Sequence, residues 1–165
     1  RKIFNIGTFS NPVFPEMYKR PATSVGSSLL GAEYVANGGR AFALGGGLHH
    51  GMAGFANGFC FLNDLVFAIW RLRALGLQRV AYVDLDAHHP DGLEAAFPHE
   101  KDLFIISTHE ENRWPFLGKL NDNRPERIMN IPLPASAGNS LIVVAVDVLS
   151  GKVCDFIFLV VTPIP

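Results

Sequence analysis

The fold is decided by Arg79–Gly92, "RVAYVDLDAHHPDG", where an apolar run passes directly into acids and histidines. Its first half, Arg79–Leu85, is short and rich in β-branched and aromatic residues, which is typical of a central strand buried on both faces. Leu103–Ser107 repeats the pattern. With helices between them, such strands predict a parallel α/β sheet, because parallel neighbours need crossover connections.

Helices are predicted from apolar residues at helical spacing. We expect one over about Thr23–Asn37, a second over Leu62–Leu75, and a short one between the two strands. The apolar positions are Val25, Leu29, Ala32 and Val35 or Ala36 in the first helix, and Leu65, Val66, Ile69, Trp70 and Leu72 in the second. Gly38 and Gly76 stand where these helices should end.

The connecting segments carry two further expectations. Two prolines make Asn11–Tyr18 a loop. Ala41–Leu44 is predicted to be a short buried strand that runs into three glycines, Gly45–Gly47.

The composition is that of a compact domain, because 48% of the 165 residues are hydrophobic and only 18% are charged. Lys and Arg (14) nearly cancel Asp and Glu (15), which argues against a direct nucleic-acid or anionic-membrane partner. No apolar run approaches the roughly 20 residues of a bilayer-spanning helix, and no signal peptide is readable. Cys60 and Cys154 form no CxxC pair, so a reducing cytoplasm is predicted.

The acids and histidines after the strand form the first candidate site. Alternate residues of an extended strand point to the same face, so Asp84, Asp86 and His88 are expected to project together from its carboxyl end, where α/β sheets build sites. Asp86 and His88 offer an oxygen and a nitrogen suited to zinc or another divalent ion, although a catalytic zinc usually has three protein ligands. The alternative is a purely structural role, in a solvated strand end with an Asx-type turn.

A second cluster lies in "GGGLHHG", Gly45–Gly51. Neutral imidazoles are common general bases, and a carboxylate on the far ring nitrogen fixes their tautomer. We therefore expect His49 and His50 to be catalytic, with Asp84 and Asp91 as their orienting partners. The bland alternative is a hydrogen-bonded histidine pair in a tight turn, and His89, His99, His109 and Cys60 are expected to be structural.

Three blocks in order, "GGGLHHGMAGFANGFCFLNDLVFAIWRL", "RVAYVDLDAHHPDGLEAAF" and "IISTHEENRWPF", resemble the zinc-dependent deacetylases. These comprise histone deacetylases and their bacterial acetoin-utilisation and acetylpolyamine amidohydrolase relatives. The resemblance covers about Asn5–Pro134 and implies an arginase-like α/β fold, a mainly parallel sheet flanked by helices, incomplete here. Residues 1–165 would be a single partial domain of a family domain about twice as long or more.

The resemblance implies a metal-dependent amide hydrolase that removes acetyl groups from lysine side chains or acetylated amines. Asp86 and His88 look like zinc ligands, and His49, His50, Asp84 and Asp91 like the catalytic set. Gly58, Phe59 and Trp114 match the walls of the acyl-lysine tunnel, although in isolation both aromatic residues would be assigned to the core. A potassium site is implied at Asp84, Asp86, His88, Ser107 and Thr108.

Departures from the family pattern support an alternative. Ile164 stands about where the third zinc ligand, an aspartate, is expected, and Pro90 replaces a common glycine. The tyrosine that stabilises the oxyanion is expected beyond Pro165, and the acidic substrate-gripping loop before Arg1. The alternative is a catalytically inactive deacetylase-like domain that acts as a binding or interaction module. A dinuclear arginase-like hydrolase fits less well because bridging aspartates are missing, and an uncovered sheet edge predicts a homo-oligomer.

Overall fold

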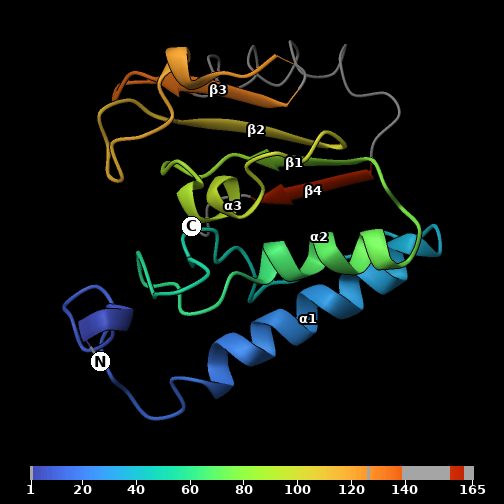
Figure 1. Ribbon diagram of the computed structural model, residues 1–165, viewed down its shortest axis with the longest axis horizontal. Coiled ribbons are helices and arrows are strands. Elements are labelled where there is room, and N and C mark those ends of the chain that lie inside the picture. The colour runs from blue at the N-terminus through green and yellow to red at the C-terminus, as the bar shows by residue number, and fades with distance from the viewer. Residues whose placement is uncertain (1, 126, 139–156, 162–165) are drawn as a thin grey trace. The chain divides into compact units, whose positions relative to one another are not determined.

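The computed structural model describes residues 2–125, 127–138 and 157–161 (Figure 1). These residues fall into two compact units. One comprises Arg1–Gln78 and Gly92–Pro98, and the other comprises Arg79–Asp91 and His99–Pro165. The assignment of residues 1–165 to one partial domain stays a prediction.

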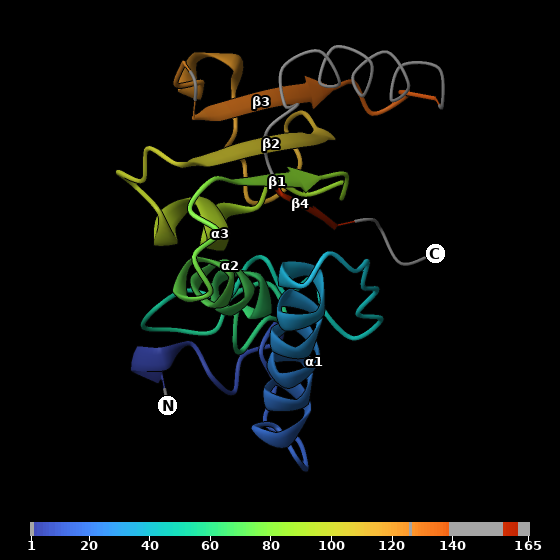
Figure 2. The ribbon, with the colours of Figure 1, turned by 90° about the vertical axis from the view of Figure 1, so that its right-hand side faces the viewer.

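The second unit contains a four-stranded sheet (Figures 1 and 2). Its strands are β1 (Val80–Asp84), β2 (Leu103–Glu110), β3 (Ile128–Leu133) and β4 (Ile157–Val161), in the order β3-β2-β1-β4. All three pairings are parallel, which confirms the predicted parallel sheet. Asp84, the last residue of β1, is in register with Ser107 of β2, so the polar ends of both strands reach the same edge of the sheet.

β1 is buried on both faces, as predicted for Arg79–Leu85. Ala81 and Val83 of β1 pack with Phe104 and Ile106 of β2 on one face. On the other face Tyr82 and Asp84 are fully buried. All five residues of β1 are buried, so a charged group can leave this strand for solvent only after Asp84.

The first unit is built around α1 (Lys19–Ala36) and α2 (Asp64–Ala74), which pack against each other. α1 begins four residues earlier than predicted, because a proline such as Pro21 is tolerated in the first turn, where amide groups have no helical partner. Its buried residues are Pro21, Val25, Ser28 and Ala32. Ser28 takes the place predicted for Leu29 because its hydroxyl donates a hydrogen bond to Asp64 of α2.

The second helix matches its prediction closely. Asn63 caps its amino end, and Gly76, with φ of +94°, follows its carboxyl end as predicted. Leu65, Val66, Ile69 and Leu72 are buried, but Trp70 is 53% exposed, so its assignment to the apolar face was wrong. Arg71 forms an ion pair with Glu33 of α1 at 2.6 Å between Nη2 and Oε1. No helix in the described ranges is long and apolar enough to span a bilayer.

Other elements differ from expectation. Ala41–Leu44 is not a strand: Phe42 and Leu44 are 82% and 77% exposed, and the carbonyl of Ala43 accepts from Gly46 N in a turn. A short apolar run without a neighbouring strand does not specify β structure. β2 continues three residues beyond Ser107, and β3 was not predicted. The short helix is α3 (Asp91–Ala96), and 3₁₀ turns lie at Lys2–Phe4 and Leu120–Asp122.

Two glycines allow the helix ends to be tested with matched substitutions. Neither Gly76 nor Gly26 has an atom within 4 Å of where a Cβ would lie, so only the backbone conformation distinguishes them. Gly76→Ala should lower the free energy of unfolding by about 1 kcal/mol, because an L-residue is disfavoured in the left-handed region. Gly26→Ala, inside α1, should raise it by about 0.5–1 kcal/mol. Urea unfolding of both variants checks this, and effects of the same sign would contradict it.

Candidate active site

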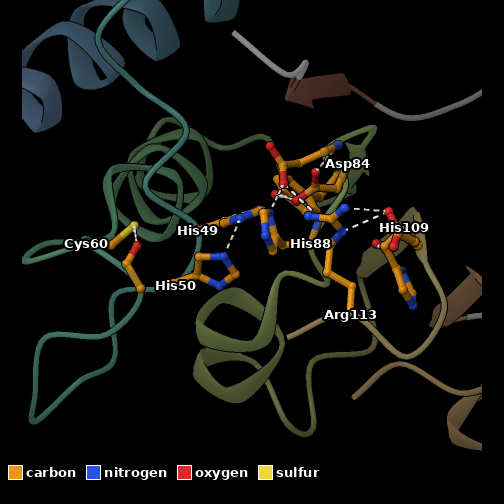
Figure 3. Close-up of polar contacts among 12 residues, drawn as sticks. His49, His50, Cys60, Asp84, His88, His109 and Arg113 are labelled. Carbon is orange, nitrogen blue, oxygen red and sulfur yellow. Dashed lines mark hydrogen bonds and ion pairs between the residues drawn. The ribbon is translucent and has the colours of Figure 1, made fainter. Parts of the chain in front are cut away.

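A buried histidine pair occupies the glycine-rich turn of the first unit. His49 and His50 are only 4% and 5% exposed, and their Nε2 atoms lie 3.0 Å apart (Figure 3). At that distance one Nε2 donates and the other accepts, so a single proton lies between the two rings. Two adjacent imidazoles that share a proton are suited to take up and return one, and the catalytic role of the pair stays a prediction.

The backbone of this turn is fixed from two directions. The carbonyl of His49 accepts hydrogen bonds from Asn63 Nδ2 at 3.1 Å and from Leu93 N at 3.0 Å. A Cβ at Gly92 would lie 2.6 Å from Gly51 O and 2.7 Å from His49 O, which leaves room only for glycine. The starts of α2 and α3 therefore hold the histidines from outside the turn.

In the second unit the acids and histidine after β1 are joined by consecutive turns. Asp84 is fully buried and accepts hydrogen bonds from the Tyr82 hydroxyl and, at 2.9 Å, from Asp86 N. Asp86 Oδ1 in turn accepts from His88 N at 2.8 Å. Since β1 ends at Asp84, the explanation from alternating strand residues was wrong for Asp86 and His88. Asx-type turns, the bland alternative, bring the side chains together instead.

Asp86 and His88 place two donors of the kind zinc prefers side by side. Oδ1 of Asp86 lies 2.9 Å from Nδ1 of His88, and the two side chains are 26% and 37% exposed. An oxygen and an imidazole nitrogen this close fit two ligands of one divalent ion. The described ranges contain no group of three His, Cys, Asp or Glu residues that could complete such a site. Ile164, the position predicted to lack the third ligand, lies outside the described residues.

Three of the residues predicted for potassium binding, Asp84, Ser107 and Thr108, lie at the same end of the sheet. Ser107 is in register with Asp84, and Thr108 Oγ1 lies 3.5 Å from the backbone oxygen of Asp84. Ser107 Oγ is 2.8 Å from Nδ1 of His109, whose Nε2 lies 2.9 Å from Gly118 O. Both ring nitrogens of His109 thus have local partners, which agrees with the structural role predicted for it.

The residues predicted to contact substrate are not in the core. Gly58 and Phe59 form a tight turn with φ of +50° and +64°, and Phe59 is 65% exposed. Asn11 Oδ1 accepts from Phe59 N at 3.1 Å. A cavity of about 240 Å³ lies beside Phe59 and Leu48. Trp114 is 38% exposed, with its ring 6.2 Å from that of His88 between centroids. Neither aromatic residue is therefore part of the core, and their place in an acyl-lysine tunnel stays a prediction.

The predicted site residues lie in both units. His49, His50, Gly58 and Phe59 belong to the first unit, and Asp84, Asp86, His88, Asp91, Ser107, Thr108 and Trp114 to the second. Pairing of the imidazoles with Asp84 and Asp91 stays a prediction. The sequence reasoning missed Asn63 and Asp64, although an asparagine directly before an apolar helical pattern is a recognised N-cap signal.

Gly92 closely approaches the turn Gly47–Gly51, which we call the histidine turn, and this contact can be tested. Gly92→Ala would push a methyl group into the backbone of His49–Gly51, which cannot yield as a flexible side chain would. We expect a loss of about 1–3 kcal/mol in unfolding free energy, the usual range for overpacking. Gly54→Ala is the matched control, since a Cβ there meets nothing within 4 Å. Thermal unfolding of the two variants checks this, and equal stabilities would contradict the tight contact.

Comparison with known proteins identifies relatives of this chain. The family described as histone deacetylase domain matches residues 2–156. The chain is 41% identical over 117 residues to acetoin utilization protein AcuC of Bacillus subtilis, covering 70% of this chain and 30% of that protein. It is 45% identical over 91 residues to histone deacetylase HOS1 of Saccharomyces cerevisiae, covering 53% and 19%. The chain thus spans less than a third of these curated relatives.

Solved structures agree with the fold. A crystal structure of an HDAC homolog from Aquifex aeolicus superposes with a TM-score of 0.88 at 31% identity, covering 97% of this chain and 46% of that one. A crystal structure of an HDAC homolog complexed with SAHA gives the same values. The predicted arginase/deacetylase-like α/β fold with a parallel sheet is confirmed, and the chain holds less than half of it. Because the family match extends over nearly all of its residues, this chain belongs to the histone deacetylase domain family.

Proposed function

We propose that this chain is part of a metal-dependent amide hydrolase that removes acetyl groups from lysine side chains or acetylated amines. The observation that carries the proposal is the buried His49–His50 pair, whose Nε2 atoms share a proton in a member of the histone deacetylase domain family. Amide cleavage needs a group that takes a proton from water and one that gives a proton to the leaving amine. Coupled imidazoles can do both.

We further propose that Asp84 and Asp91 are the orienting partners of His49 and His50. The covalent chain supports this for Asp91, since it directly precedes Gly92, whose backbone packs against the turn. Asp84 is buried and already holds two hydrogen bonds, so its carboxylate is fixed in orientation. A carboxylate hydrogen-bonded to one ring nitrogen leaves the other nitrogen to act as a base.

Asp86 and His88 would hold a zinc ion together with a third ligand from outside the described residues. When bound, zinc would polarise the acetyl carbonyl and lower the pKa of water. The 2.9 Å separation of the two donor atoms supports this assignment. A potassium ion would be held at the same sheet edge by Asp84, Asp86, His88, Ser107 and Thr108, which is supported by the proximity of Thr108 Oγ1 to the Asp84 carbonyl.

Gly58, Phe59 and Trp114 would line the path of the acyl-lysine chain. The exposure of both aromatic rings supports this, because a substrate channel needs apolar side chains that the core has not used. Trp114 also lies beside the candidate metal ligand His88, so a substrate that touched its ring would end near the metal.

A second candidate function is a catalytically inactive deacetylase-like domain that acts as a binding module. One observation favours it: the described ranges contain no group of three His, Cys, Asp or Glu residues that could hold a metal ion. We also propose a cytoplasmic location and self-association. The first is supported by the cysteine pattern and the second by β3 and β4, which end the order of the described strands.

Zinc binding separates the two candidates. The purified protein should contain about one zinc per chain and hydrolyse a fluorogenic acetyl-lysine peptide. His88→Ala should remove most of the zinc, because two remaining protein ligands are fewer than catalytic sites use. His99→Ala, at an exposed position, is the control and should keep zinc and activity. Metal analysis by mass spectrometry checks this. A protein that is silent and metal-free would favour the inactive domain.

The proton-transfer role has its own test. His49→Ala and His50→Ala should each lower kcat by about 10²–10⁴-fold, the usual contribution of a general acid or base. Their zinc content should equal that of the unmodified protein, because neither residue is assigned to the metal. Steady-state kinetics with parallel zinc analysis measures both quantities. Activity within threefold of the unmodified protein in both variants would refute the catalytic assignment.

A further inference from the structure

The first residue that holds the histidine turn, Asn63, contacts it on both sides of His50. Its Nδ2 donates to His49 O and to Gly51 O, each at 3.1 Å. Its Oδ1 accepts from Val66 N at 3.3 Å and so caps α2. The side chain is buried, with the residue only 7% exposed. One amide group therefore fixes the backbone before and after His50 and ties it to the start of a helix.

Asp64, the next residue, fixes the other arm of the turn. It is fully buried, and its Oδ1 accepts from Leu48 N at 2.8 Å. Its Oδ2 accepts from Gly47 N at 3.2 Å and from the Ser28 hydroxyl at 2.6 Å. A Cβ at Gly46 would lie 2.6 Å from Oδ2, so the glycines let the carboxylate come this close.

These contacts satisfy four backbone groups of a turn that belongs to no strand or helix. Backbone N–H and C=O groups away from solvent need hydrogen-bond partners. Here two consecutive side chains supply them for four groups, namely Gly47 N, Leu48 N, His49 O and Gly51 O. The contact between the rings is sensitive to this support. A shift that lengthens the 3.0 Å Nε2–Nε2 distance beyond about 3.5 Å breaks the hydrogen bond.

We propose that Asn63 and Asp64 are positioning residues, which act through the backbone of Gly47–Gly51 to hold the Nε2 atoms of His49 and His50 within proton-sharing distance. The catalytic consequence rests on the proposed function. The geometric claim concerns the imidazole pair alone and can be tested without activity.

The test separates positioning from simple helix stability. Asn63→Ser keeps a side-chain oxygen that caps α2 but removes both donors to the turn. Asp64→Asn keeps the shape of the side chain but replaces one acceptor oxygen with a donor that faces Gly47 N and Ser28. Arg71→Ala is the matched control, since it breaks the α1–α2 ion pair with Glu33 and lies in the last turn of α2, at the opposite end from Asn63 and Asp64.

The direct readout is the ¹⁵N spectrum of the ring nitrogens in protein labelled at histidine, with His49→Ala and His50→Ala used for assignment. The unmodified protein should show one protonated and one unprotonated Nε2 in this pair. Asn63→Ser and Asp64→Asn should shift these resonances toward those of the exposed His99, whereas Arg71→Ala should leave them in place. In the active protein, kcat should fall by about 10–100-fold in the first two variants with KM within threefold, as expected for misplaced catalytic groups.

Each outcome decides the proposal. Ring resonances that stay unchanged in folded Asn63→Ser and Asp64→Asn overturn it, and so does an equal change in Arg71→Ala. If either variant fails to fold, Ser28→Ala, which removes a single donor to Asp64, should give a smaller shift in the same direction, and no shift overturns the proposal. An unmodified protein without hydrolysis but with the expected ring spectra would refute the proposed function and leave the positioning role supported.

Discussion

The structure depends on the complete burial of β1. Its five residues lie between two parallel neighbours with both faces covered, so no charged group can be solvated along its length. Asp84, the one acidic residue of β1, is nevertheless fully buried, and it is accommodated because the Tyr82 hydroxyl and the amide of Asp86 donate hydrogen bonds to its carboxylate. Residues that bind a ligand or react can therefore lie only at or beyond the end of β1. The candidate site residues of this unit all follow that point in the sequence or stand at it.

The two units hold their candidate site residues in place in different ways. In the sheet unit, short Asx turns place each side chain by bonding it to the next backbone amide, so Asp84 fixes Asp86 and Asp86 fixes His88. In the helical unit, the histidine turn has few bonds of its own and depends on the start of α2. The first arrangement is local in sequence, and the second joins residues more than ten positions apart.

This difference explains how much could be predicted from the sequence. Apolar composition was enough for β1, and helical spacing with a terminal glycine was enough for α2, because both features are local. Ser28 on the buried face of α1 and Asn63 beside the histidines depend on partners 36 and 14 residues away, and no periodicity reports such contacts. The strand predicted at Ala41–Leu44 was wrong for the opposite reason: the segment is apolar, but no neighbouring strand pairs with it. The candidate site residues were predicted from sequence motifs, but motifs give no information about the contacts that position these residues.

The turn at Gly58 and Phe59 lowers the stability of the fold. A bulky residue with φ of +64° loses about 1–2 kcal/mol relative to ordinary backbone, and glycine at that position would relieve it. The chain nevertheless carries an aromatic ring there and presents 65% of the residue to solvent, where it adds little to folding. Fold stability alone would select a smaller side chain at position 59. Phenylalanine at position 59 therefore lowers thermodynamic stability and leaves an aromatic ring accessible for contact with another molecule.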